Sequence, residues 1–227
     1  KLGAEVLVTP TDVTDAGQVE HLVSATVERY STIDILVNNA GIPGPIGNLE
    51  DNDMAAWISV IQVNLIGLYL CCRAVLALMR RNNLGRIVNL SGAGAANAWA
   101  NMSAYCASKA AVVRLTEVLA LELAGTDITV NALGPGSVHT RMWDEMTVAA
   151  ADAGADLIHE TGRRVTSGGG ASIERCADLA VWLAGRGANG LSGRIISAFN
   201  DDFESLSPSI PQIMSSDLYT LRRVDPE

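Results

Sequence analysis

The feature that most constrains this fold is a regular alternation of short apolar runs with longer amphipathic segments. Short apolar runs bounded by turn residues predict buried strands, and apolar residues spaced three and four apart predict helices. Strand–helix–strand alternation predicts an α/β fold with a doubly wound, mostly parallel sheet, helices on both faces and ligands beyond the carboxyl ends of the strands. The predicted strands span residues 5–10, 33–37, 85–90, 129–133 and 194–198, and the predicted helices span residues 15–30, 51–81, 103–124 and 173–186.

Composition limits the classes of function. The chain has 227 residues, which suits one α/β domain with an ample core. With 48% hydrophobic and 18% charged residues, intrinsic disorder is excluded. The net charge is -9 and no basic tract occurs, so nucleic acid or an anionic membrane surface is not expected as a partner.

The cysteines indicate a reducing environment. Four occur in the chain, and they show neither metal-ligand spacing nor the density of a disulfide framework: Cys71, Cys72, Cys106 and Cys176. We therefore expect a cytoplasmic protein.

One segment, residues 60–79, is apolar enough to raise the question of a membrane span. It contains Gln62, Asn64 and Arg73, each of which is costly at a bilayer centre. We expect instead a helix that is buried by the sheet and by another subunit.

Tyr105 and Lys109 are the first candidates for catalysis. Ser103 is expected to cap a helix, and a spacing of four places both side chains on one face of it. An ammonium at ~4 Å in a dielectric of ~20 contributes about 4 kcal/mol, or roughly three pKa units. Such an ammonium would bring the pKa of a phenol toward neutral pH. The alternative is an ordinary helix with an exposed lysine, and this spacing alone does not decide between them.

Further motifs accompany this pair in a fixed order. They are 38–41 (Asn-Asn-Ala-Gly) after a strand, Asn64 inside the long helix, the strand 85–91, the segment 130–136 (Val-Asn-Ala-Leu-Gly-Pro-Gly) and Thr140. In this order and spacing they closely resemble the short-chain dehydrogenase/reductase family, from about Thr11 to Ser197. The resemblance implies a Rossmann-like domain over residues 1–198, with a variable substrate loop at 137–172 and an additional tail at 199–227.

The resemblance also implies a function. It implies an oxidoreductase that transfers a hydride between NAD or NADP and an alcohol or carbonyl substrate. Tyr105 would give or take the hydroxyl proton, Lys109 would lower its pKa and contact the nicotinamide ribose, and Asn64 would support a proton relay. The residue that usually selects NAD or NADP belongs to a strand that the sequence does not contain.

Cofactor contacts are implied along the whole motif series. Proline fixes the turn after residue 134, and glycine lets the backbone approach a ligand. The residues assigned by resemblance are Asp12 and Val13 at the adenine ring, Asn38, Ala40 and Gly41 at the ribose and central strand, Pro135 and Gly136 in the turn, and Val138 and Thr140 at the nicotinamide carboxamide.

The sequence departs from the family pattern at its start. No glycine-rich phosphate turn precedes Asp12, and Gly3 is the only glycine there. By that pattern the sequence begins at the third strand and lacks one βαβ unit, about 30 residues or more. Either the sequence is incomplete or the unit is deleted. We favour incompleteness, because a sheet without its central strand would expose a large apolar face.

A second departure concerns the catalytic serine. The family places it thirteen residues before the tyrosine, where this chain has Gly92, and Ser91 lies one position earlier. A one-residue shift reverses the face of a strand, although a strand end can turn enough to recover it. Losing one oxyanion donor typically costs ~2.7–4 kcal/mol, so Ser91, Asn101 or Ser103 would have to substitute. Gly92 therefore leaves open a catalytically weak or inactive binding or regulatory protein.

The remaining features carry weaker expectations. We expect Gly168–Gly170 to form the hinge of a substrate lid and His139 to lie exposed in a loop. Arg163 and Arg164 either meet an anionic substrate group or are only solvated. A homodimer or homotetramer is expected through the long helices, and the tail either packs across a subunit, covers the substrate site or is mobile.

Overall fold

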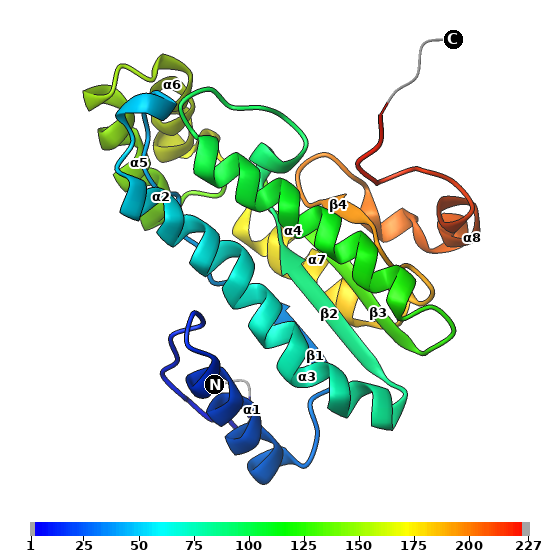
Figure 1. The fold of residues 1–227 in the computed structure, drawn as a ribbon. Helices are drawn as coiled ribbons and strands as arrows, with labels where there is room; N and C mark the ends of the chain where they lie inside the picture. The colour runs from blue at the N-terminus through cyan, green and yellow to red at the C-terminus, as the bar shows by residue number, and fades with distance from the viewer. Residues whose placement is uncertain (1–2, 224–227) are drawn as a thin grey trace.

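The computed structural model describes residues 3–223 and contains a sheet of four parallel strands with helices on both faces (Figure 1). In the described residues the strands follow the order of the chain across the sheet, and each pairs in parallel with the next: β1 (Ile35–Asn38), β2 (Gly85–Leu90), β3 (Ile128–Gly134) and β4 (Ile195–Ser197). The predicted α/β class with a parallel sheet is confirmed.

Helices account for most of the regular structure. They are α1 (Ala16–Tyr30), α2 (Met54–Ile61), α3 (Leu68–Asn82), α4 (Ser103–Glu122), α5 (Arg141–Asp152), α6 (Asp156–Arg164), α7 (Ile173–Ala184) and α8 (Ile210–Met214). Two π-helical turns, Gln62–Gly67 and Val165–Gly169, and five short 3-10 turns, Leu49–Asp51, Ala93–Ala95, Arg186–Ala188, Phe203–Ser205 and Ser207–Ser209, lie between them.

The alternation of side chains along β2 explains why both faces of the sheet are covered. Ile87 packs with Val130 in a core shared with α3 and α4. Val88 points the other way and packs with Leu133 and with α7. Because successive residues of a strand face opposite sides, a strand that is apolar at both positions needs a helix on each face.

The long helix that was considered as a membrane span is a core helix in this structure. Met54–Asn82 runs through α2, a π turn and α3, and it is long and apolar enough to cross a membrane by length and composition alone. Its buried residues Cys72, Val75 and Met79 pack against Ile87 of β2. Such packing is expected of a helix that covers a sheet, as predicted.

The predicted strand at residues 5–10 is wrong. No regular element occurs there, and Val6 and Val8 are 78% and 79% exposed. This segment lies beside α1, where Glu5 forms an ion pair with Arg29 (Figure 1). A strand forms only when a neighbouring strand satisfies its backbone groups, and no described strand lies next to this segment.

The first helix and the helix of Tyr105 begin differently. Asp15 caps α1 by accepting hydrogen bonds from the amides of Gly17 and Gln18. Ser103 does not cap α4, because the helix begins at Ser103 and Met102 occupies the cap position. The Ser103 hydroxyl instead accepts a hydrogen bond from Trp57 Nε1 at 3.0 Å.

The described part of the tail, residues 199–223, folds back over β4 and α4 of the same chain (Figure 1). The amide of Ile195 in β4 donates to the carbonyl of Tyr219 at 2.9 Å. Glu117 of α4 accepts from Arg222 and from the amide of Leu221. Most of the tail therefore covers the outer edge of the sheet.

Candidate active site

Tyr105 and Lys109 face the same side of α4, as their spacing predicts. Lys109 Nζ lies 5.8 Å from the centre of the Tyr105 ring. The ammonium donates a hydrogen bond to the carbonyl of Leu90, at the end of β2, at 2.9 Å. Lys109 thus joins the helix to the carboxyl end of a central strand.

The electrostatics of the pair differ from the expectation. Burial raises the pKa of Tyr105 to about 12, with the nearby Cys106 thiol adding to the rise. Burial lowers the pKa of Lys109 to about 8. The expected lowering of the tyrosine pKa is therefore not found, because desolvation penalises the phenolate more than the lysine favours it. At neutral pH Tyr105 carries its proton and can act as an acid.

Asn64 holds the loop after β1 close to Lys109. It lies in the π turn of the long helix, where its side-chain oxygen accepts from the amide of Ile42 at 2.8 Å. Its amide nitrogen donates to the carbonyl of Ile42 and to Ser108 Oγ, each at 3.0 Å. A Cβ built on Gly41 would lie 3.6 Å from Lys109 Nζ, so the loop meets the lysine directly.

Asn38 serves the sheet with its side chain. Its amide nitrogen donates to Asn89 Oδ1 at 2.9 Å and to Cys72 Sγ at 3.3 Å. The bond to Asn89 ties β1 to β2. The neighbouring Asn39, which the sequence did not single out, lines the hollow beside Tyr105 instead.

One hollow, which we call the Tyr105 hollow, gathers most of the predicted site. It has a volume of about 320 Å³ and lies beyond the carboxyl ends of β1, β2 and β3. The predicted residues that line it are Gly41, Ser91, Tyr105, Lys109, Pro135, Gly136, Val138 and Thr140, and they are joined by Asn39, Leu90, Met142, Trp143, Ile173 and Cys176.

A second hollow, the Gly92 hollow, adjoins the first at Gly136 and has a volume of about 280 Å³. It is lined by Gly92, Ala93, Ala96, Asn97, Gly134, Gly136, Ser137, Arg164, Gly169, Ala171, Ile195, Ser197, Phe199 and Asn200. The beginning of the tail, Phe199 and Asn200, therefore reaches this site.

Gly92 and Ser91 have different surroundings. A Cβ built on Gly92 would lie only 2.4 Å from the Tyr105 hydroxyl oxygen, so this hydroxyl occupies the space of a side chain at position 92. Ser91 lines the Tyr105 hollow, and its buried Oγ has no hydrogen-bond partner. Ser91 and Tyr105 therefore line one hollow, although the Ser91 Oγ itself is buried. The other two candidates, Asn101 and Ser103, line neither hollow.

The predicted adenine contacts lie apart from both hollows. Asp12 Oδ1 accepts hydrogen bonds from the amide and hydroxyl of Thr14. Val13 packs against the π turn, where a Cβ on Gly67 would lie 2.7 Å from Val13 Cγ2. Ala40 is exposed and also lines neither hollow.

The lining residues that the sequence reasoning missed come mainly from α5 and α7. Trp143 belongs to α5, while Ile173 and Cys176 belong to α7. Cys176 Sγ donates to the carbonyl of Pro135 at 3.0 Å. No sequence signal marks these residues, because only the packing of both helices over the strand ends brings them to the site.

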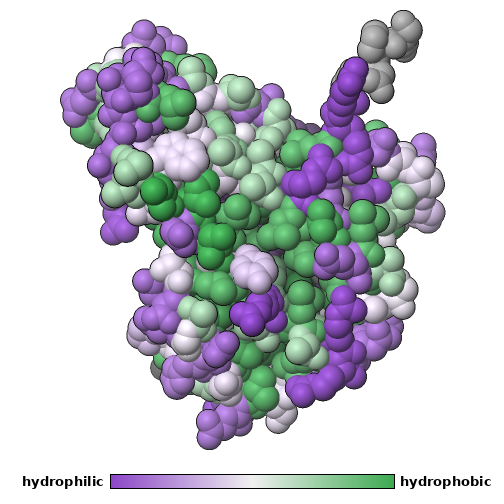
Figure 2. All heavy atoms as spheres, viewed as in Figure 1, coloured by the Kyte–Doolittle hydropathy of each residue, from purple (hydrophilic) through white to green (hydrophobic). Residues whose placement is uncertain are grey.

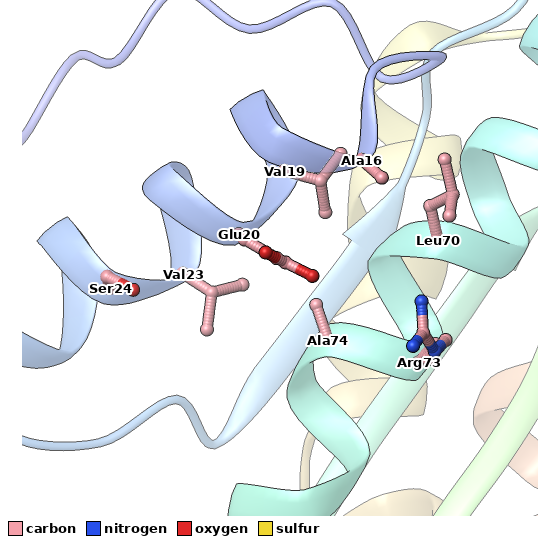
Figure 3. Close-up of a pocket in the computed structure, with 8 residues that line it drawn as sticks. All are labelled: Ala16, Val19, Glu20, Val23, Ser24, Leu70, Arg73 and Ala74. Atoms are coloured by element: carbon pink, nitrogen blue, oxygen red, sulfur yellow. The ribbon is translucent and has the colours of Figure 1, made fainter.

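A hollow of about 400 Å³ between α1 and α3 is separate from this site (Figure 3). Val19, Glu20 and Val23 of α1 lie on the side that faces Ala74 of α3 (Figure 3). It contains none of the predicted catalytic residues. Among residues 3–223, no group of acidic, histidine and cysteine side chains is arranged to hold a metal ion.

Comparison with known proteins places this geometry in a family. The family model described as enoyl-(acyl carrier protein) reductase matches residues 1–198. The (2S)-[(R)-hydroxy(phenyl)methyl]succinyl-CoA dehydrogenase subunit BbsD of Thauera aromatica is 42% identical over 147 residues, which are 63% of this chain and 57% of that protein.

Solved structures agree with the sequence comparison. NAD+-bound xylitol dehydrogenase superposes with a TM-score of 0.75 at 28% identity, over 82% of this chain and 75% of that one. Actinorhodin polyketide ketoreductase with NADPH superposes with a TM-score of 0.74 at 35% identity, over 82% and 74%. The family-model match, together with Tyr105 and Lys109 at the carboxyl ends of a parallel sheet, establishes that the chain belongs to the short-chain dehydrogenase/reductase family.

Proposed function

We propose that the chain acts as an NAD(P)-dependent oxidoreductase on a small alcohol or carbonyl compound. The observation that carries this proposal is the Tyr105 hollow, which is lined by Tyr105 with its protonated phenol, by Lys109 with its buried ammonium and by Ser91. A proton donor and hydrogen-bond donors around a common space are what reduction of a carbonyl requires.

The residues of this hollow fit the nicotinamide end of NAD or NADP. The loop at Gly41 passes close to Lys109 Nζ, so a ribose bound there would contact both the loop backbone and the ammonium. Pro135, Val138 and Thr140 also line this hollow, and by the family pattern they would hold the carboxamide. Relatives with NAD+ and with NADPH both exist, so either cofactor suits the proposal.

The roles of the residues follow from their contacts. When bound, the nicotinamide cofactor supplies or accepts the hydride. Tyr105 donates its proton to the substrate oxygen during reduction and takes it back during oxidation. Lys109 holds positive charge beside the developing phenolate, and Ser91 Oγ is the available second donor to the substrate oxygen.

A non-catalytic binding protein is the second candidate function. Gly92 favours this function, because the position at which the family has its catalytic serine carries no hydroxyl here. The Tyr105 hydroxyl occupies the space of a side chain at position 92. A donor lost from an oxyanion site costs about 10²–10³ in rate. Turnover of the wild-type protein distinguishes the two functions.

The substitution Tyr105→Phe tests the catalytic assignment. We expect reduction of a ketone panel with NADH and NADPH to fall by about 10²–10⁴, since general acid catalysis contributes this much. Cofactor affinity, measured by energy transfer from tryptophan, should change little. Unchanged turnover in the variant would show that Tyr105 is not the acid. Cofactor binding without turnover in the wild type would support the binding protein.

We further propose that the chain forms a homodimer or homotetramer through α2, α3 and α4. An apolar band crosses the face that these helices present (Figure 2). The exposed apolar residues on them include Met54, Ile58, Tyr69 and Leu121, the last 79% exposed. Such a continuous patch is typical of an interface. Sedimentation of Leu121→Glu should show dissociation, and an unchanged oligomer would exclude this face.

A cytoplasmic location is also proposed. The four cysteines lie in the described chain and are all free. Free, partly buried thiols are typical of a reducing compartment. Fractionation of cells that produce the tagged protein tests this, and recovery in the membrane or secreted fraction would contradict it.

A further inference from the structure

The Gly92 hollow lies next to the proposed catalytic hydroxyl. Gly92 lines this hollow, and a Cβ built on Gly92 would lie 2.4 Å from the Tyr105 hydroxyl oxygen. Gly136 lines both hollows, so the two spaces meet at this glycine. A substrate whose oxygen contacts Tyr105 can therefore extend into the Gly92 hollow.

The charge in this second hollow has one sign. Arg164 is the only charged residue among those that line it, and no carboxylate does, although the chain has a net charge of -9. The remaining polar groups are amides and hydroxyls: Asn97, Ser137, Ser197 and Asn200. Because an arginine supplies the only charge among the lining residues, the hollow favours anions although the protein as a whole is acidic.

The Arg164 guanidinium is available to a ligand. In the described chain it makes no hydrogen bond or ion pair, and only the backbone carbonyl of Arg164 is engaged, by Ser167 Oγ at 3.1 Å. A Cβ on Gly169 would lie 2.9 Å from Arg164 Cγ, so the missing side chain of Gly169 leaves room for the arginine stem.

The neighbouring Arg163 has a different position. Arg163 lines an outer hollow together with Arg164, Glu160, Thr166 and Ser167, and it does not line the Gly92 hollow. Both arginines are exposed at the end of α6. This pair therefore provides a test residue and a matched control of the same type.

We propose that the substrate is a small keto or hydroxy acid, with its carboxylate bound by Arg164 and its reacting oxygen at Tyr105. This inference rests on the proposed function and adds the substrate class. A guanidinium binds a carboxylate through two parallel hydrogen bonds, which fixes orientation as well as charge. A volume of about 280 Å³ suits a short acid.

The experiment compares levulinate, a keto acid, with its neutral methyl ester. For the wild type, Arg164→Gln, Arg164→Lys and Arg163→Gln, one measures KM and kcat with NAD(P)H, and the Kd of each probe by calorimetry. We expect the wild type to favour levulinate by ~10-fold or more, because a hydrogen bond to a charged group contributes this much. Arg164→Gln should raise the KM for levulinate to that of the ester with little change in kcat. Arg164→Lys should retain part of the preference for levulinate over the ester. Arg163→Gln, the control, should retain all of this preference.

The inference would be overturned by a wild type that binds the ester as tightly as the acid, or by an acid preference that survives in Arg164→Gln. If neither probe is reduced but Arg164→Gln still selectively weakens levulinate binding, the anion site stands and the catalytic proposal fails. Phosphate and chloride as competitors distinguish a carboxylate site from a general anion site. Equal competition by chloride would contradict carboxylate recognition.

Discussion

At the scale of single residues, Gly92 and Ser91 bear on the proposed binding of a substrate oxygen. The Tyr105 hydroxyl occupies the space that a side chain at position 92 would need. The neighbouring Ser91 lines the same hollow as Tyr105, and its hydroxyl is buried and unpartnered. A buried hydroxyl without a partner is costly for stability, which favours a role in binding a ligand.

The substitution Ser91→Ala separates these two effects. We expect turnover to fall by about 10²-fold, as for loss of an oxyanion donor. We expect the free energy of unfolding, measured in urea, to stay unchanged or rise, because the hydroxyl makes no hydrogen bond that the variant would lose. Unchanged turnover would show that Ser91 is not the second donor.

The buried ammonium of Lys109 is expected to lower the stability of the folded protein while it supports activity. Burial lowers its pKa to about 8, so below pH 8 the folded protein holds an ammonium that the unfolded state would solvate better. Stability should therefore rise with pH between about 8 and 10.5, where the unfolded lysine binds more protons.

Thermal unfolding of Lys109→Met checks this sign. At pH 7 the variant should melt at a higher temperature than the wild type, by about 2–4 °C for each kcal/mol by which its free energy of unfolding rises. It should also lose activity. The gain should shrink toward pH 10.5. A lower melting temperature at pH 7 would mean that the bond to the Leu90 carbonyl outweighs the cost of burial.

At the scale of elements, the π turn Gln62–Gly67 connects the long helix to the active site. Asn64 satisfies both backbone groups of Ile42 and the hydroxyl of Ser108 from this turn. Val13 packs against Gly67 of the same turn. π turns are frequently found at functional sites, and here the turn fixes the loop that approaches Lys109.

The substitution Asn64→Ala should therefore affect stability and activity together. It leaves the two part-buried backbone groups of Ile42 without partners, at a cost of about 1–3 kcal/mol in the free energy of unfolding, while Ser108 keeps its bond to the carbonyl of Tyr105. The loop at Gly41 loses its anchor, so kcat should fall as well. Gln62→Ala, at an exposed position of the same turn, is the control and should change neither. Equal effects of both substitutions would contradict the role of Asn64.

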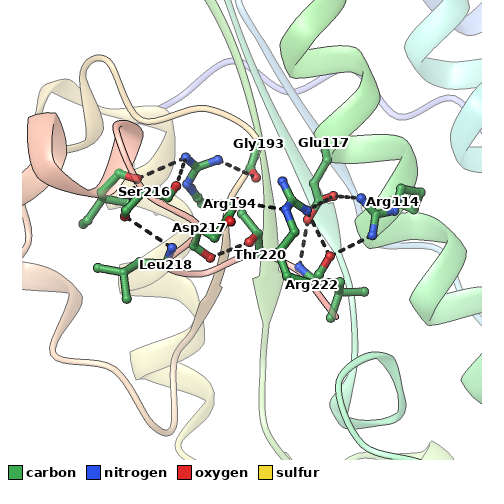
Figure 4. Close-up of polar contacts among 11 residues, drawn as sticks. Arg114, Glu117, Gly193, Arg194, Ser216, Asp217, Leu218, Thr220 and Arg222 are labelled. Atoms are coloured by element: carbon green, nitrogen blue, oxygen red, sulfur yellow. Dashed lines mark hydrogen bonds and ion pairs between the residues drawn. The ribbon is translucent and has the colours of Figure 1, made fainter. Parts of the chain in front are cut away.

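At the scale of the whole molecule, the tail closes one edge of the sheet and anchors on α4 (Figure 4). Glu117, only 6% exposed, pairs with Arg114 and with Arg222. Arg194, next to β4, donates to the carbonyls of Ile213 and Ser216. These contacts cover an edge strand, which would otherwise present unpaired backbone groups.

The substitution Glu117→Gln should release this anchor. We expect chymotrypsin to cleave the tail faster and the free energy of unfolding to fall by about 1–3 kcal/mol, since a charged, hydrogen-bonded group is lost. Glu122→Gln, at the exposed end of the same helix, is the control. An unchanged cleavage rate would show that the apolar contacts of the tail suffice to hold it.

Local patterns predicted the elements whose formation depends on neighbouring residues in the chain. The strand Gly85–Leu90 has the predicted bounds, and Asp15 and Ser172 cap their helices. The predicted strand at residues 5–10 failed because pairing requires a partner that no local pattern supplies. Ser103 failed as a cap because distant Trp57 engages its hydroxyl.

The sequence by itself determined the parallel α/β architecture and placed Tyr105 and Lys109 on one face of a helix, because periodicity fixes which side chains share a face. Only the tertiary structure decided the state of that pair. Burial, which depends on every element around the hollow, raised the pKa of Tyr105 and lowered that of Lys109. Tertiary packing also decided that the Asn38 side chain ties β1 to β2 and that Arg164 shares a hollow with Gly92, since such contacts join residues that lie far apart in the sequence.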